Sequence, residues 1–197
     1  MLISRIEPTF MNTELPWVEE VLHFWFQELG SALWFATDDE VDSKIRVRYL
    51  ALHEGIINSA VPDDSGPRTL LAAVIVLDQL SRNMFRGTPR AFAADSIARS
   101  LARRAIALGF DVAMTREERY FVYLPFEHSE DREDQALSVR LIGQLGNQEW
   151  TRYALVHQKI INRFGRFPHR NIILARTSRP DELPFVDLSF SSQFEEL

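Results

Sequence analysis

Arginine and acidic side chains gather at three places in this 197-residue sequence, and each is a candidate site for binding or proton transfer. The first follows an apolar run that ends at Leu77; it comprises Asp78, Gln79, Arg82, Asn83, Arg86 and Arg90. Several guanidinium groups close together bind carboxylates and phosphates, because their planar fork matches two oxygens at once. The alternative is internal: Asp78 pairs with Arg82 or Arg86 and closes the end of the core, since a buried carboxylate requires a cationic partner.

The second place is segment 163–171, which contains no acid and includes Arg163, Arg166, His169, Arg170 and Asn171. Pro168 is expected to open a short helix that runs to Leu174. The start of such a helix offers free backbone N–H groups beside positive side chains, which is what an anion site requires. The alternative is a Gly–Pro turn whose arginines pair with acids of neighbouring helices, for which the acids of segment 126–134 are candidates.

The third place contains Glu127, His128 and Glu130. Two carboxylates around a histidine suit either a divalent metal or an acid–base pair. Their spacing matches no established metal motif, and Glu130 already suits the start of a helix, so we expect no metal and no cofactor. Glu127 and His128 remain candidates for a general base. A further histidine, His157, lies on an apolar helix stripe, which is typical of a neutral core residue; a pH switch or proton shuttle is the alternative.

Helical periodicity runs along almost the whole chain, and no segment alternates with the period of a strand. The run from Leu70 to Leu77 has no polar side chain, so we expect a helix from Pro67 to about Leu80 that is buried on all sides. Capping boxes are expected at Thr37 with Glu40 and at Thr115 with Glu118, and N-caps at Ser129 and at Ser178 with Asp181. About eight or nine helices of 8–20 residues then pack as antiparallel hairpins, which predicts an all-α fold.

An aromatic stripe lies near the start of the predicted fold, and it consists of Trp17, Phe24, Trp25, Phe26, Trp34 and Phe35. Rings at helical spacing generally pack in a core. A platform for stacking a ligand is the alternative. Pro125 is expected to end or kink the helix that begins near Thr115, because proline removes a helical hydrogen bond.

Composition limits the kinds of partner. The formal net charge is -6 and cysteine is absent, so we expect neither nucleic-acid binding nor disulfides. Only Lys44 and Lys159 are lysines among 22 basic residues, which reflects either genome composition or selection for the arginine fork. No signal peptide or membrane-spanning run is visible, so we expect a cytoplasmic protein that does not bind membranes.

The length fits one domain over residues 1–197, with residues 1–13 and 186–197 expected to attach loosely. No repeat of fixed period is visible along the chain. Nothing in the sequence predicts the oligomeric state.

Four motifs carry a resemblance to a known family: FWF at 24–26, LDQLSRNMFRGTPRAFAADSIA at 77–98, ERYFVYLPFEHSEDREDQ at 118–135 and RFGRFPHRN at 163–171. They resemble the DUF924 family of bacterial proteins, and the resemblance runs from about Trp17 to Asp187. It implies an all-helical, tetratricopeptide-like superhelix without regular repeat sequence. It implies no activity and no catalytic residues.

Three hypotheses for function follow, in order of preference. The first is a binding module in which arginines of 82–90 and 163–170 line a pocket for an anionic small molecule or acidic peptide. The second is a structural network that fixes how the hairpins pack. The third is a hydrolase-type enzyme in which Glu127 or His128 is the general base and arginines stabilise negative charge, the candidates being Arg82, Arg86 and Arg166.

Overall fold

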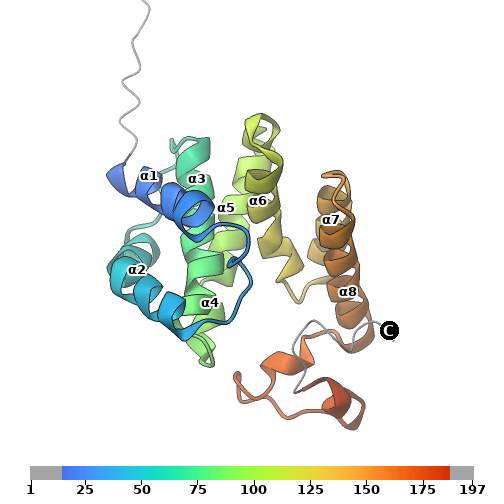
Figure 1. Ribbon diagram of the computed structural model, residues 1–197. Helices are drawn as coiled ribbons and strands as arrows, with labels where there is room; N and C mark the ends of the chain where they lie inside the picture. Colours follow the sequence, from blue (N-terminus) through green and yellow to red (C-terminus); the bar gives the residue numbers. More distant parts are fainter. Residues whose placement is uncertain (1–14, 187–197) are drawn as a thin grey trace, which may run out of the picture.

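The computed structural model describes residues 15–186, which form helices, turns and loops with no strand (Figure 1). The α-helices are α1 (Pro16–His23), α2 (Asp39–Ser59), α3 (Pro67–Val74), α4 (Ser81–Met84), α5 (Asp95–Ala107), α6 (Arg116–Glu127), α7 (Arg132–Gly143) and α8 (Gln148–Phe164). Two segments are π-helical: η1 (Phe24–Leu29) and η2 (Ile75–Leu80). Four are 3-10 helices: η3 (Pro89–Phe92), η4 (Phe110–Ala113), η5 (Pro168–Arg170) and η6 (Pro180–Phe185). The all-α prediction is confirmed. The ends expected to attach loosely lie outside the described residues, apart from Val186.

The run α3–η2–α4 passes through the middle of the molecule (Figure 1). Helices α1 and α2 pack against one side of this run, and α5 and α6 against the other. Helices α7 and α8 follow as an antiparallel pair, with α7 against α6. The chain after α8 then turns back toward the end of the molecule where α4 lies (Figure 1). Residues from both halves of the sequence therefore meet near the end of the central run.

Burial of the central run agrees with its composition. Every residue from Thr69 to Ser81 is at most 7% exposed, including the polar Asp78 and Gln79. The helix is continuous from Pro67 to Met84 and so extends beyond the predicted end near Leu80. A helix that is apolar on every face must be covered on all sides to be shielded from water. Helices α1, α2, α5 and α6 pack around this run and cover it.

Four residues of the aromatic stripe pack around one ring, Phe121 of α6, whereas Phe24 meets Tyr49 at a centroid distance of 5.1 Å. The rings of Trp25, Phe26 and Trp34 meet Phe121 edge-on, at centroid distances of 5.4, 5.6 and 4.8 Å. Edge-to-face packing is the arrangement that ring quadrupoles favour in a core. Phe35 differs from the expectation: it is 60% exposed and lies at the rim of this cluster.

Two helix starts differ by one or two residues from the prediction. Helix α2 is capped by Asp38, whose carboxylate accepts hydrogen bonds from the backbone N–H groups of Glu40 and Val41, and not by Thr37. Helix α7 is capped by Asp131 and not by Ser129. In both cases an aspartate follows the expected cap within two residues, and its ionised carboxylate also suits the positive end of the helix.

Helix α6 begins at the predicted capping box. Thr115 Oγ1 accepts from the backbone N–H of Glu118 at 3.2 Å, and the Glu118 carboxylate accepts from the backbone N–H of Thr115 at 2.8 Å. Pro125 lies inside the helix, which ends two residues later at Glu127. The proline therefore agrees with the expected helix end, and Glu127 and His128 lie at that end.

The Thr115→Ala variant is expected to lose about 1 kcal/mol of unfolding free energy, because the cap of α6 is removed. Urea unfolding followed by circular dichroism measures the change. Ser43→Ala, at an exposed position inside α2, is the matched control and is expected to change stability by less than about 0.5 kcal/mol. Equal effects of the two variants would show that the box does not stabilise α6.

Candidate functional site

The central run widens into a π-helix at η2, and this segment carries Asp78. A π-helical turn holds one more residue than an α-helical turn and is found frequently at functional sites. Asp78 is 0% exposed, although it is a carboxylate. A carboxylate in such a position must be surrounded by donors, and these donors define the candidate site.

Three side chains satisfy Asp78. His128 Nδ1 lies 3.0 and 2.8 Å from the two carboxylate oxygens, and Gln79 Nε2 donates at 2.6 Å. Arg82, one helical turn later, places a guanidinium nitrogen 3.3 Å from Oδ1. Burial by itself raises the pKa of Asp78, but the charges of Arg82 and His128 and their contacts hold this pKa well below its usual range. Asp78 is therefore ionised at neutral pH.

His128 follows the last residue of α6, and its side chain is 15% exposed. Because the Asp78 carboxylate can only accept, Nδ1 carries the hydrogen and Nε2 keeps its lone pair. Nε2 makes no hydrogen bond within residues 15–186 and is not sealed from solvent. Burial lowers the pKa of His128, Asp78 opposes this change, and the charge of Arg82 adds to it. The imidazole is therefore neutral at pH 7, with a basic nitrogen available.

Arginines from the two predicted places meet at Asp95, in the first turn of α5. Both terminal nitrogens of Arg82 donate to the Asp95 carboxylate at 3.1 Å. A terminal nitrogen of Arg170, in η5, lies 3.9 Å from the same carboxylate. Burial and the charge of Arg82 lower the pKa of Arg170 to about 10, which still leaves it cationic at neutral pH. Asp95 thus holds two guanidinium groups close together.

Arg170 is held mainly by aromatic rings. Its guanidinium carbon lies 4.7 Å from the ring centroid of Phe92 and 4.4 Å from that of Phe167. The residue is only 6% exposed. Within residues 15–186 the guanidinium makes no hydrogen bond, and its Nε is buried without a partner. A buried guanidinium with five donors and one distant carboxylate is an unusual arrangement, because unpaired buried donors cost free energy.

Glu127 and His157 extend the cluster inward. Glu127 is 3% exposed; its Oε1 lies 3.1 Å from His157 Nδ1, and its Oε2 is buried without a partner among the described residues. Burial and the charge of Asp78 raise the pKa of Glu127 to about 8. Glu127 is therefore protonated at neutral pH, which argues against it as a general base and leaves His128 as the other candidate.

His157 has the surroundings expected of a neutral core histidine and also lies beside the site. Its Nδ1 donates to the carbonyl oxygen of Tyr153 at 2.9 Å, and burial lowers its pKa well below the usual value. Its ring centroid is 6.3 Å from that of His128. The nearby His169 has a pKa lowered to about 3 by burial and by the charge of Arg170. These two histidines are therefore neutral at physiological pH.

The other predicted residues lie elsewhere. Asn83 and Arg86 both donate to Asp42, and all three line a separate cavity of about 380 Å³ beside α2. Arg163 is exposed, with its guanidinium over the rings of Phe164 and Phe185. Arg90 pairs with Glu54 on the surface. These four residues are therefore not brought to the Asp78 cluster.

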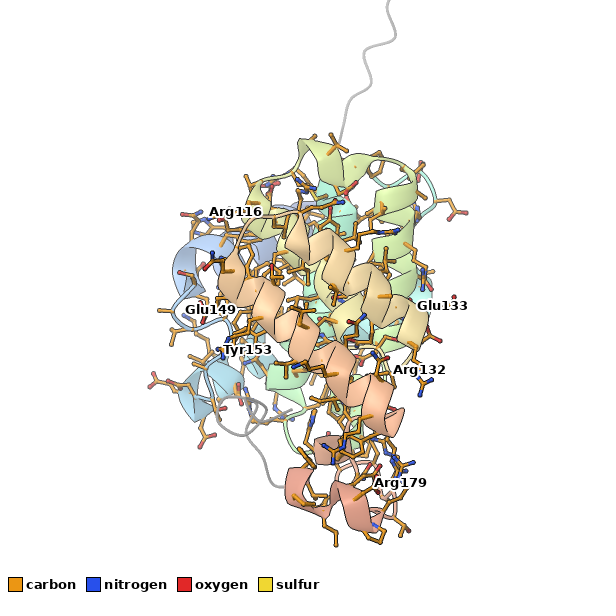
Figure 2. The ribbon with its side chains drawn as sticks, turned by 90° about the vertical axis from the view of Figure 1, so that its right-hand side faces the viewer. Arg116, Arg132, Glu133, Glu149, Tyr153 and Arg179 are labelled. Carbon is orange, nitrogen blue, oxygen red and sulfur yellow. The ribbon has the colours of Figure 1, made fainter. Side chains whose placement is uncertain are left out.

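Arg166 and Asn171 fasten the chain that follows α8. Arg166 donates to both oxygens of the buried Glu182 at 2.7 and 2.6 Å, and Asn171 Nδ2 donates to Glu182 at 3.2 Å. Arg176 makes a similar two-pronged bond to Glu130, at 2.8 and 3.0 Å. The expected pairing with acids of segment 126–134 is therefore made by Arg176, not by Arg163 or Arg166. These bonds hold segment 165–186 together and tie it to the turn between α6 and α7, and this segment carries Arg170. Figure 2 shows the segment beyond the end of α8.

The helix expected from Pro168 to Leu174 is only the three-residue η5, so the argument from a helix N-terminus does not apply. Segment η6 follows Arg179, so the cap expected at Ser178 is also wrong. The cationic character here comes from the side chain of Arg170 rather than from backbone N–H groups.

Sequence reasoning missed Asp95 and Phe92, and it did not predict that His157 lies beside Glu127 and His128. Asp95 follows Arg82 by 13 residues, across a turn and η3, so no helical spacing relates them. One indication was available: Asp95 is the first acid after Arg82 in the sequence. It could have been proposed as a partner for the arginines of this segment, of which Arg86 and Arg90 pair with acids of α2 instead.

Three further observations describe the surroundings of the cluster. A cavity of about 700 Å³ lies between α1, η1, the start of α3, the start of α6 and the start of α8. Phe26, Trp34 and Trp150 line it, and it does not include the Asp78 cluster. In the described part of the chain, no group of three or more histidine, aspartate or glutamate side chains is arranged to hold a metal ion. Among the same residues, no helix has the length and apolarity to span a membrane.

Comparisons with known proteins agree with the fold. Residues 21–189 match the model of a family described as DUF924, bacterial protein of unknown function. A solved structure described as a protein of unknown function from Agrobacterium tumefaciens is similar, with a TM-score of 0.81 and 35% sequence identity. The match covers 87% of this chain and 97% of the other. No curated protein matches significantly.

Proposed function

The chain belongs to the DUF924 family, and we propose that it binds an anionic small molecule through Arg170 and Arg82. The supporting observation is the state of Arg170: a buried cation without a hydrogen bond in the described part of the chain, 3.9 Å from a carboxylate that Arg82 already holds at 3.1 Å. Oxygens of a carboxylate or phosphate would satisfy its donors, because a charge-assisted fork is the strongest partner for guanidinium.

A small ligand suits the site better than an acidic peptide. The side chains of Arg170, Asp95 and His128 are 8%, 13% and 15% exposed, so only a narrow part of each is open to solvent. A peptide makes extended contacts along a surface, whereas a small anion can enter far enough to reach Arg170. An acidic peptide that stabilises the protein while small anions do not would reverse this preference.

Arg170→Met is expected to abolish stabilisation by added anions. Thermal unfolding is measured with inorganic phosphate or succinate, at constant ionic strength maintained with sodium chloride. A ligand at ten times its Kd contributes about 1.4 kcal/mol, which raises Tm by about 3–5 °C for a protein of this size. The wild type is expected to show this rise and Arg170→Met to lose it.

Two variants complete the test. Arg86→Met, whose side chain is paired with Asp42 at the separate cavity, is the matched control and is expected to keep the full rise. Arg170→Lys keeps the charge but not the fork, so a reduced rise is expected. If no anion raises Tm of the wild type, or if Arg170→Met responds normally, the cluster is a structural network and the binding proposal is wrong.

We also propose that the helices form a tetratricopeptide-like superhelix and that the protein works in the bacterial cytoplasm. Support for the first comes from α5, α6, α7 and α8, each of which packs against the next in sequence order. Support for the second is the composition and the family description.

A further inference from the structure

We infer that the site is also catalytic: His128, oriented by Asp78, is the general base with which water hydrolyses a small carboxylic ester that carries an anionic group. This inference rests on the proposed binding of an anion by Arg170 and Arg82. It assigns a reaction, which binding alone does not require.

The geometry that carries the inference is the contact between His128 and Asp78. A buried carboxylate at 2.8 Å from Nδ1 fixes the imidazole ring and keeps the hydrogen on Nδ1, so the lone pair stays on Nε2. A purely structural histidine would normally use both nitrogens or bury the second. Here the second nitrogen makes no hydrogen bond within residues 15–186 and remains accessible. That is the arrangement required of a general base.

The base and the anion site belong to one connected network. His128 and Arg82 contact the same oxygen of Asp78, at 3.0 and 3.3 Å. Arg82 and Arg170 contact the same oxygen of Asp95, at 3.1 and 3.9 Å. Arg170 and His128 are thus joined through Asp95, Arg82 and Asp78, and the inference assigns the carboxylate of the substrate to Arg170 and its ester group to His128. Binding both groups of the substrate would supply the orientation that a catalysed step needs.

Water is the nucleophile that the site accommodates. Among the described residues no serine or threonine hydroxyl is bonded to His128, and Ser129 Oγ, its neighbour in sequence, donates to Asp134 at 2.7 Å. A water molecule at Nε2 gives its proton to that nitrogen as its oxygen forms a bond to the ester carbon. The carbonyl electron pair moves onto oxygen and returns as the C–O bond to the alcohol breaks. The alcohol leaves with the proton from Nε2, which regenerates neutral His128.

The surroundings of His128 determine the pH profile. The charged and titratable groups that face it from the neighbouring elements are Asp78, Arg82, His157, His169 and Arg170. Burial and the two arginines lower the pKa of His128 below its usual 6.5. Protonation would occupy Nε2, so kcat/KM is expected to fall in acid, with a midpoint below 6.5.

His128→Asn is the decisive variant. The asparagine amide can donate to Asp78 in place of Nδ1, but it has no basic nitrogen in place of Nε2. The probe is 4-nitrophenyl hemisuccinate, an activated ester with a free carboxylate, compared with uncharged 4-nitrophenyl acetate. The wild type is expected to prefer the anionic ester by at least about tenfold in kcat/KM. His128→Asn is expected to lose about 10²- to 10⁴-fold of the activity on hemisuccinate.

Controls separate this inference from the binding proposal. His23→Asn changes an exposed histidine of α1 whose side chain is 65% exposed, and it is expected to retain wild-type activity. His128→Asn is expected to keep the rise in Tm with succinate, which Arg170→Met loses together with hydrolysis. Two outcomes would overturn catalysis and leave binding intact. In the first, succinate raises Tm but the wild type hydrolyses the ester no faster than buffer does. In the second, succinate raises Tm but His128→Asn hydrolyses the ester as fast as the wild type. Hydrolysis without discrimination between the two esters would also overturn catalysis.

Discussion

Asp78→Ala is expected to lower the free energy of unfolding by about 3–5 kcal/mol, which is the usual consequence of removing one partner from a buried ion pair. The substitution leaves the guanidinium of Arg82 and the amide of Gln79 without the carboxylate that they contact at 3.3 and 2.6 Å. It also leaves Nδ1 of His128 without an acceptor. Urea unfolding measured at pH 7 gives the change.

The control for this variant is Asp63→Ala. Asp63 is fully exposed and lies 3.7 Å from Arg104, so solvent screens its ion pair and its loss is expected to change stability far less. The contrast between the two aspartates isolates the effect of burial. If Asp78→Ala were no more destabilising than Asp63→Ala, the network around Asp78 would not hold the central run in place.

Glu127→Gln is expected to be more stable than the wild type at alkaline pH and nearly equal to it at pH 5. The folded protein raises the pKa of Glu127 from 4.5 to about 8, so between these values the folded state binds a proton that the unfolded state has lost. Wild-type stability from this group therefore falls as pH rises, by up to about 1.4 kcal/mol per pH unit and about 3–4 kcal/mol between pH 5 and 8. Glutamine, which does not ionise, avoids this loss.

The measurement is the difference in unfolding free energy between variant and wild type at several pH values. The buried histidines have lowered pKa values, so their protonation destabilises the folded protein in acid. This pH dependence is opposite to that of Glu127 and would obscure it if only the wild type were measured. Both proteins share these histidines, and the difference removes their effect. Glu149→Gln, at an exposed position of α8, is expected to show no such trend (Figure 2). A difference that stays constant with pH would mean that Glu127 is ionised when buried.

Local sequence patterns predicted the features that local geometry determines. The buried run at Leu70–Leu77 follows from its composition, and the contact between Asp78 and Arg82 follows from their spacing of four residues on a helix. The capping box at Thr115 was predicted for the same reason. These features depend on residues that are close in the chain, so no knowledge of the tertiary arrangement is required.

Apart from the expected proximity of the two arginine-rich segments, which Arg82 and Arg170 show at Asp95, features that depend on distant residues were not predicted. The contact between Asp78 and His128 joins residues 50 positions apart, and Asp95 meets Arg170 only because segment 165–186 turns back. The π-helical turn that carries Asp78 also has no periodic indication, since the run is apolar on every face. The choice among several arginines depends on which acids neighbouring helices present, as Arg86 shows by pairing with Asp42.

The position of Arg170 on the segment after α8 has a consequence for biosynthesis. Four residues of the cluster are synthesised before residue 130: Asp78, Arg82, Asp95 and His128. The helices that carry or precede them, from α3 to α6, contact one another directly. Arg170 emerges about 40 residues later and is positioned through Arg176 and Glu182, which emerge later still. Arg170 is thus added last, so a nascent chain can orient His128 against Asp78 well before it completes the arginine pair to which we assign anion binding.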